Sequence, residues 1–136
     1  SIKEPLSNYS LIMAITIKGV IKYELYKQQA INTDIYYKYL EDLLKNLKNK
    51  YILMDNISFH TSGRILELIK NSGNEVLFIP PYSPDLNPIE EVFSKMKAFI
   101  RRYLTPLTLN KDIHILLKKF VKSIDNFEGY YKHVFD

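Results

Sequence analysis

The sequence predicts an α/β fold in which an antiparallel hairpin and two parallel strands form a mixed sheet flanked by helices. The first observation is a nearly continuous apolar run over 9–16, typical of a strand buried on both faces, followed after Lys18-Gly19 by apolar/polar alternation over 20–26. The second is a strand, helix, strand order over 51–79, which indicates a crossover unit with parallel strands. The third is strong helical periodicity in the final third of the chain.

The middle of the chain supplies the next elements. Asn32, Thr33 and Asp34 offer N-caps for a helix, and basic residues follow its end at Lys45, Lys48 and Lys50. A short strand over 51–54 ends on Asp55-Asn56, a helix runs from about 62 to 71, and Asn71-Ser72-Gly73-Asn74 stops it before a strand over 76–79. The apolar stripe of the first helix consists of Ile35, Tyr39, Leu40, Leu43, Leu44 and Leu47.

The apolar periodicity of the final third of the chain predicts two amphipathic helices, over 89–100 and 109–124, separated at Thr105-Pro106. The apolar end over 127–136 is expected to dock against the rest. The seam of the first helix is Ile89, Val92, Phe93, Met96, Phe99 and Ile100, and the inner side of the second is Ile113, Leu116, Leu117, Phe120 and Val121.

Length and composition predict that residues 1–136 form a single domain, and the 46% hydrophobic content argues against disorder. No apolar run is long enough to span a membrane and no signal peptide is visible, so we expect neither a membrane protein nor a secreted one. The absence of cysteine excludes disulfides and thiolate chemistry. The first residue is Ser1, which suggests a piece of a longer protein.

Basic residues are concentrated late in the chain, although the net charge is only +4. Residues 92–122 include eight basic residues and a single acid, Asp112. This excess of positive charge is expected of a phosphate-binding face. An ordinary solvated helical surface explains the charge equally well. The basic residues are Lys95, Lys97, Arg101, Arg102, Lys111, Lys118, Lys119 and Lys122.

A proline-rich stretch over 78–91 leads into the helix that begins near Ile89. Such a stiff approach suggests that Glu90 must be placed accurately, but Asn87 as N-cap, Pro88 and Glu90 also read as a capping box. Helical spacing predicts that Glu90 faces inward, on a stripe with Ser94, Lys97 and Arg101. Glu91 is expected to point to solvent and pair with Lys95.

Asp55 follows a strand at the end where open α/β sheets usually carry functional residues, although a turn-capping role is the more common one. Asp55 and Glu90 could converge on a divalent cation, and oxygen ligands suit Mg²⁺ better than zinc. A lone histidine such as His60 is more often structural than a ligand, and Asp85 suits a Ser-Pro-Asp turn.

Two motifs make the chain recognisable: Met-Asp-Asn-Ile-Ser-Phe-His over 54–60 and Pro-Pro-Tyr-Ser-Pro-Asp-Leu-Asn-Pro-Ile-Glu over 80–90. They resemble the mariner-type superfamily of cut-and-paste DNA transposases, also described as DDE superfamily endonucleases. Thirty-four residues lie between Asp55 and Glu90, as between the second and third catalytic acids of one branch. The resemblance extends from Tyr9 to Gly-Tyr-Tyr-Lys-His over 129–133.

The resemblance implies an RNase H-like fold in which three carboxylates hold two Mg²⁺ ions, with Mn²⁺ as a substitute, for DNA cleavage and strand transfer. It implies that Asp55 is the second acid and Glu90 the third, both catalytic and metal-binding, with Asn56 and His60 in support. DNA, as element ends and target, is the implied partner, and a homodimer is possible. The implied DNA-binding residues are Lys95, Lys97, Arg101, Arg102, Lys118 and Lys119.

One feature departs from the family pattern. The first acid of the family lies on a strand before the hairpin, and residues 1–136 hold no acid at a matching position; Asp34 lies in the wrong place. We therefore expect that these residues alone do not cleave DNA. Two alternatives remain open: a decayed or domesticated remnant that binds DNA without catalysis, and an unrelated α/β hydrolase that uses Asp55 and His60.

The expected location follows from the implied partner. A DNA transposase would act in the nucleus of a eukaryote, or in the cytoplasm and nucleoid of a bacterium.

Overall fold

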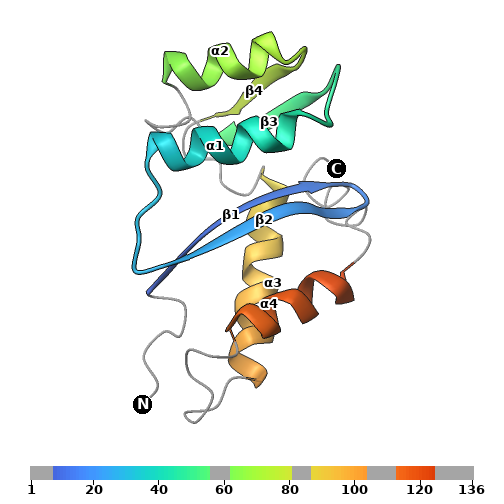
Figure 1. Ribbon diagram of the computed structural model, residues 1–136. Coiled ribbons are helices and arrows are strands. Elements are labelled where there is room, and N and C mark those ends of the chain that lie inside the picture. The colour runs from blue at the N-terminus through green and yellow to red at the C-terminus, as the bar shows by residue number, and fades with distance from the viewer. Residues whose placement is uncertain (1–7, 56–61, 81–86, 104–112, 125–136) are drawn as a thin grey trace. The chain divides into compact units, whose positions relative to one another are not determined.

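The computed structural model describes residues 8–55, 62–80, 87–103 and 113–124. The chain divides into two compact units. The hairpin unit comprises residues 1–29 and 88–136, and the parallel-strand unit comprises residues 30–87. Figure 1 labels the elements of both units.

The hairpin unit begins with β1 (Tyr9–Thr16) and β2 (Gly19–Lys27), which pair antiparallel as predicted. Thr16 pairs with Gly19, so the turn residues are Ile17 and Lys18, one position earlier than predicted. Gly19 has φ +137°, a conformation that L side chains rarely adopt, which explains why glycine follows the turn.

The pairing register of the hairpin shifts between Ala14 and Ile15, because Ala14 pairs with Lys22 while Ile15 pairs with Val20. Ile21 is therefore the extra residue of a β-bulge. The predicted burial of β1 on both faces holds only at its centre, where Ile12 and Met13 are buried. The other residues of β1 are half-buried, and β2 is the one strand paired with it in the described part of the chain.

Two helices complete the hairpin unit: α3 (Pro88–Tyr103) and α4 (Ile113–Ser123). The predicted seam of α3 is confirmed, since Val92, Met96 and Ile100 recur every four residues and are at most 4% exposed. Phe99 of α3 contacts Phe120 of α4 with ring centroids 5.7 Å apart. The hydrophobic core of the unit consists of Met13, Val92, Met96, Ile100, Ile113, Leu116, Leu117 and Phe120.

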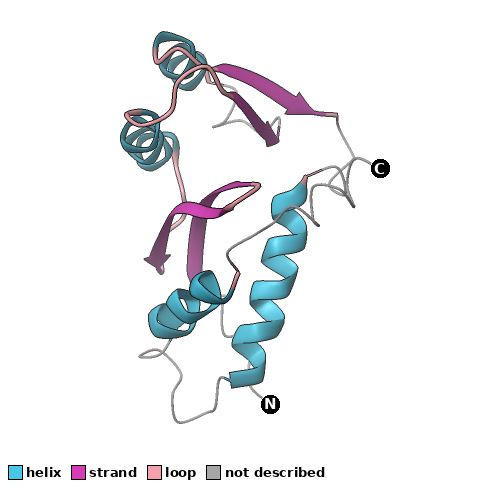
Figure 2. Ribbon diagram, turned by 90° about the vertical axis from the view of Figure 1, so that its right-hand side faces the viewer, coloured by secondary structure: helices cyan, strands magenta, loops and turns pink. Residues whose placement is uncertain are grey.

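The parallel-strand unit contains α1 (Thr33–Leu44), β3 (Tyr51–Asp55), α2 (Gly63–Asn71) and β4 (Glu75–Ile79). β3 and β4 pair parallel, which confirms the predicted crossover (Figure 2). The buried residues of α1 are Tyr36, Tyr39, Leu40 and Leu44. Tyr36 was not predicted to be buried, whereas the predicted Ile35, Leu43 and Leu47 are only half-buried.

Side-chain caps set where both helices of this unit begin. The Asn32 side chain accepts from the Ile35 amide at 2.9 Å, and the Ser62 hydroxyl accepts from the Ile65 amide at 3.3 Å. Each cap satisfies a backbone donor that the first helical turn leaves without a partner. The predicted basic end of α1 lies just beyond the helix, because α1 ends at Leu44 and Lys45 is its C-cap.

Asn74 ties together the two loops that enter the parallel strands. Its side chain is 3% exposed, accepts from the Lys50 amide at 2.9 Å and donates to the Leu47 carbonyl at 2.9 Å. It also donates to the Ser72 hydroxyl at 2.9 Å. The side-chain oxygen and nitrogen of the buried Asn74 therefore both have partners. These hydrogen bonds fix the edge of the sheet at which the two parallel strands begin.

The described strands form two two-stranded sheets, β1-β2 and β3-β4. The hairpin and the parallel pair are therefore confirmed, while their union in one mixed sheet and the single domain over 1–136 stay predictions. The break at Thr105-Pro106 and the docking of residues 127–136 fall outside the described residues. In the described ranges, no helix combines the length and the apolar character that a membrane crossing requires.

Candidate functional site

Asp55 is the last residue of β3, where it pairs with Ile79 at the end of β4. It therefore lies at the carboxyl edge of the parallel pair, the edge at which open α/β sheets bind their ligands. The backbone position matches the prediction. Asn56 and His60, the two predicted supporting residues, fall outside the described residues, as does Asp85.

Glu90 is the third residue of α3, the position that the capping-box pattern predicts for a helix beginning at Pro88. Asn87 and Pro88, which precede it, are both buried. The buried entry fixes where the helix starts. It therefore also fixes the position from which the Glu90 side chain projects. The capping role of Glu90 stays a prediction.

The two glutamates at the start of α3 are exposed in the reverse of the predicted order. Glu90 is exposed and Glu91 is half-buried. The stripe that Glu90 shares with Ser94, Lys97 and Arg101 is exposed along its whole length. At 100° per residue this stripe lies well to one side of the Val92-Met96-Ile100 seam, too far round the helix to turn inward.

The predicted ion pair between Glu91 and Lys95 does not form. Both side chains belong to the described part of α3, and no contact within salt-bridge distance joins them. Lys95 is exposed, and an exposed pair of this kind gains only a few tenths of a kcal/mol against the entropy of ordering two long side chains.

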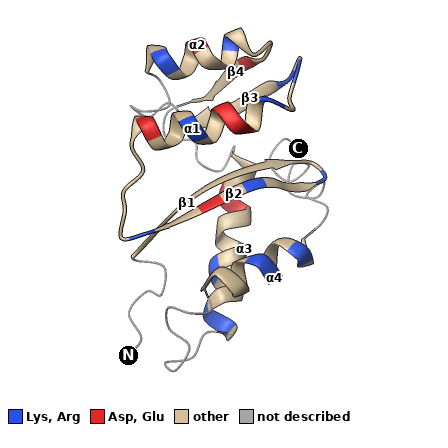
Figure 3. Ribbon diagram, viewed as in Figure 1, with Lys and Arg blue, Asp and Glu red and all other residues tan. Residues whose placement is uncertain are grey.

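The charge of α3 is graded along the helix, with Glu90 and Glu91 in the first turn and Arg101 and Arg102 in the last. The acidic groups interact favourably with the positive end of the helix dipole, and the basic groups with its negative end. Figure 3 shows basic residues continuing onto α4, which belongs to the same unit. All six residues predicted to bind DNA are exposed: Lys95, Lys97, Arg101, Arg102, Lys118 and Lys119.

Most of these cations are available to an external anion. Within the described residues, Lys95, Lys97, Lys118 and Lys119 make no ion pair, and Arg102 lies 5.9 Å from the centre of the Tyr103 ring. Unpaired cations on neighbouring helices of one unit are the electrostatic feature that phosphate binding needs. Lys111 lies outside the described residues.

Asp55 and Glu90 belong to different compact units, the parallel-strand unit and the hairpin unit respectively. Across the ranges that the structure describes, no three acidic, histidine or cysteine side chains gather into a metal-binding group. The convergence of Asp55 and Glu90 on one cation therefore stays a prediction.

Comparison with protein families finds one match that covers most of the chain. The model described as DDE superfamily endonuclease matches residues 3–108, a range that includes Asp55, Glu90 and the first four of the six basic residues. A comparison with curated proteins finds no match.

Solved structures with a similar fold include those of the Mos1 mariner transposase. Its catalytic domain is 23% identical over 91% of this chain, with a TM-score of 0.75. Its paired-end complex with Mn is 25% identical over 91% of this chain, with a TM-score of 0.76. The chain spans 66% of the first and 39% of the second. The likeness establishes a mixed α/β fold of the kind seen in that catalytic domain.

Proposed function

Because the chain belongs to the family of DDE superfamily endonucleases, we propose that it is part of the catalytic domain of a cut-and-paste DNA transposase. The observation that carries the proposal is the placement of two acids. Asp55 ends β3 at the carboxyl edge of the parallel pair and Glu90 stands in the first turn of α3, with thirty-four residues between them, inside the range that the family model matches.

The donor chemistry of the two acids fits a divalent cation of the Mg²⁺ type. Carboxylate oxygens are hard ligands, and Mg²⁺ is commonly held by one or two carboxylates together with water and substrate phosphate. Among solved Mos1 structures, the catalytic domain is described with Mn and with Mg. In our proposal Asp55 and Glu90 hold the metal in this chain, and Asn56 and His60 support them.

Bound metal would supply Lewis-acid stabilisation of the attacking and leaving oxygens at a DNA phosphodiester. The chain itself contributes the position of the ligands. The end of β3 fixes the backbone of Asp55, and the buried Asn87-Pro88 entry fixes the start of the helix that carries Glu90. Rigid elements of this kind hold a site more accurately than loops do.

The exposed basic residues of α3 and α4 are proposed to contact the DNA backbone. Contacts between lysine or arginine and phosphate give affinity and orientation but little sequence information. Mos1 is described in a paired-end complex with a left transposon end. For this chain we propose DNA as the partner, in the nucleus or the nucleoid, and a homodimer as the assembly of the parent protein.

The experiment that tests the proposal is cleavage of element-end DNA by the intact parent transposase in Mg²⁺. Loss of a ligand's charge in Asp55→Asn or Glu90→Gln should lower the rate by at least about a hundredfold, because even outer-shell metal partners are worth 10- to 100-fold. Glu91→Gln is the matched control, since it removes the same charge one residue along the helix. Full cleavage by Glu90→Gln would refute the assignment and favour a hydrolase that uses Asp55 and His60.

We also propose that residues 1–136 by themselves do not cleave DNA, because the family pattern requires a third carboxylate that these residues do not supply. The measurement is nicking of supercoiled plasmid in Mg²⁺ or Mn²⁺. Nicking that disappears in Asp55→Ala or Glu90→Ala would overturn this.

A second candidate function is DNA binding without catalysis, as in a domesticated remnant. The lysines of α3 and α4 that make no ion pair within the described residues favour it, because they lie within one unit and need neither acid: Lys95, Lys97, Lys118 and Lys119. The sequence of the reading frame before Ser1 distinguishes the two functions. A strand that ends in aspartate there supports the enzyme, and its absence supports the remnant.

A further inference from the structure

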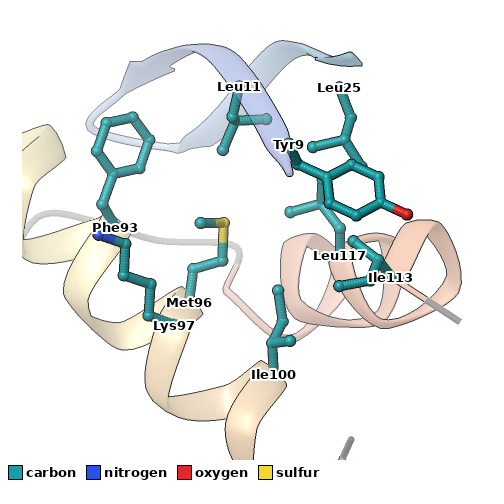
Figure 4. Close-up of a pocket in the computed structure, with 9 residues that line it drawn as sticks. All are labelled: Tyr9, Leu11, Leu25, Phe93, Met96, Lys97, Ile100, Ile113 and Leu117. Atoms are coloured by element: carbon teal, nitrogen blue, oxygen red, sulfur yellow. The ribbon is translucent and has the colours of Figure 1, made fainter. Parts of the chain in front are cut away.

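A pocket opens in the hairpin unit where the hairpin, α3 and α4 meet (Figure 4). Its volume is about 240 Å³. Eight of its lining residues have largely apolar side chains that converge from the three sides of the space: Tyr9, Leu11, Leu25, Phe93, Met96, Ile100, Ile113 and Leu117. The pocket is open to solvent, and its volume exceeds that of a single water and is large enough for a small molecule.

Among the lining residues that the structure describes, Lys97 is the one that carries a charge. Its side chain is exposed and makes no ion pair in the described part of the chain. In Figure 4 its side chain runs along α3 in the direction of Phe93. The pocket thus combines an apolar interior with a single cation at the rim.

This combination selects for one chemical class of ligand. The free energy of an apolar body falls when it leaves water for the interior, and an anionic head group can form a charge-assisted contact with the exposed Lys97 ammonium. A cation as head group would be repelled, and a fully apolar molecule would leave Lys97 without a partner. The volume lies below the range of about 300–1,000 Å³ typical of sites for drug-sized ligands, so the ligand is small.

We propose that this pocket binds a small amphipathic carboxylate, with its alkyl or aryl body among Met96, Ile100 and Leu117 and its carboxylate at Lys97. The site needs neither Asp55 nor Glu90 and does not rest on the transposase proposal. It would, however, bring an anion to a residue that the proposal assigns to DNA.

The test is a titration of residues 1–136 with octanoate, followed by NMR shifts of methyl groups. We expect saturable shifts at Leu25, Met96 and Leu117 and none at Ile65 or Ile69, which are buried in the other unit. Octanoate should bind more tightly than 1-octanol, which has the same chain without the charge. Equal binding of the two compounds, or no saturable shift at these methyl groups at millimolar concentration, would overturn the proposal.

Three variants test the location of the site. Lys97→Gln should weaken octanoate binding about three- to tenfold, as expected for loss of a charge-assisted contact at a partly exposed position. Lys95→Gln removes the same charge from the same helix outside the pocket, and should leave binding unchanged; an equal loss in both variants would refute the assignment. Leu25→Phe should block binding by filling the space, and the Lys97 variant keeps the test decisive should that substitution disturb folding.

Discussion

At the scale of single residues, two glycines illustrate how backbone conformation decides the effect of the same substitution. Gly73 follows α2 with φ +85°, a region that L side chains rarely adopt, while Gly63 opens the same helix and is not among the residues with positive φ. A Cβ at Gly73 would meet only Lys48 Cδ at 3.8 Å, and one at Gly63 would meet nothing within 4 Å. Space is available at both positions, so conformation alone separates them.

We therefore predict opposite effects for Gly73→Ala and Gly63→Ala. The first should lower the free energy of unfolding by about 1 kcal/mol, because a non-glycine residue is strained at positive φ. The second should raise it by up to about 1 kcal/mol, because alanine restricts the unfolded chain more than glycine does. Urea unfolding of residues 1–136 followed by circular dichroism measures both. A stabilising Gly73→Ala would show that the loop can adopt another conformation.

The two acids of the candidate site also belong to the residue scale. Their positions in the chain follow from local rules, since a strand ends at Asp55 and α3 begins at Pro88, two residues before Glu90. Their exposure does not, because the inward orientation predicted for Glu90 is wrong and Glu91 is the more buried of the two. Spacing along a helix gives the direction of a side chain relative to its own seam, but not what packs beside it.

At the scale of elements, the loops before β3 and β4 are held together by Asn74. The Asn49 amide also donates to the Gly73 carbonyl at 2.8 Å, and the Glu75 amide to the Lys50 carbonyl at 2.9 Å. This edge of the parallel pair is therefore rich in internal hydrogen bonds, and the opposite edge carries Asp55. We interpret the first edge as the part that sets strand register and the second as the part available for function.

Asn74→Ala should lower the free energy of unfolding by about 2–3 kcal/mol. The substitution leaves the Lys50 amide and the Leu47 carbonyl without their buried partner, and unsatisfied buried polar groups cost about 1–3 kcal/mol each. Asn71→Ala is the matched control, since Asn71 is exposed at the end of α2. Equal midpoints for the two variants in urea would contradict the role assigned to Asn74.

At the scale of the whole molecule, the charge distribution is the property with a functional consequence. Acidic and basic residues are interspersed along α1 and α2, whereas the later turns of α3 and all of α4 carry only basic charges (Figure 3). A face with charges of one sign attracts polyanions over distances of about a Debye length. Binding to such a face should depend on salt more than on sequence.

We predict that residues 1–136 bind duplex DNA with little sequence preference. Each phosphate contact contributes about 0.9 to the slope of log K against log salt concentration. Lys118→Gln with Lys119→Gln should therefore reduce the slope by up to about 1.8. The control with the same charge change is Lys38→Gln with Lys70→Gln, on α1 and α2. Fluorescence anisotropy at several salt concentrations measures both, and an equal loss in the control would refute the assigned face.

The sequence by itself determined the elements, their order and the residues of the two motifs. Hydrophobic periodicity and capping residues act within a few positions of the chain, so the seam of α3, the parallel pair and the ends of α2 could be predicted from local pattern. The family match is likewise a property of the sequence.

Only the tertiary structure decided which residues meet across the chain. The bulge at Ile21, the burial of Tyr36 and Asn74 and the pocket beside Lys97 have no counterpart in local spacing. Burial and pocket shape depend on what packs from distant segments, and a bulge depends on the register of the partner strand. The physical reason is that periodicity assigns a side chain to a face of its own element, whereas packing between elements determines whether that face is covered, shared or left open.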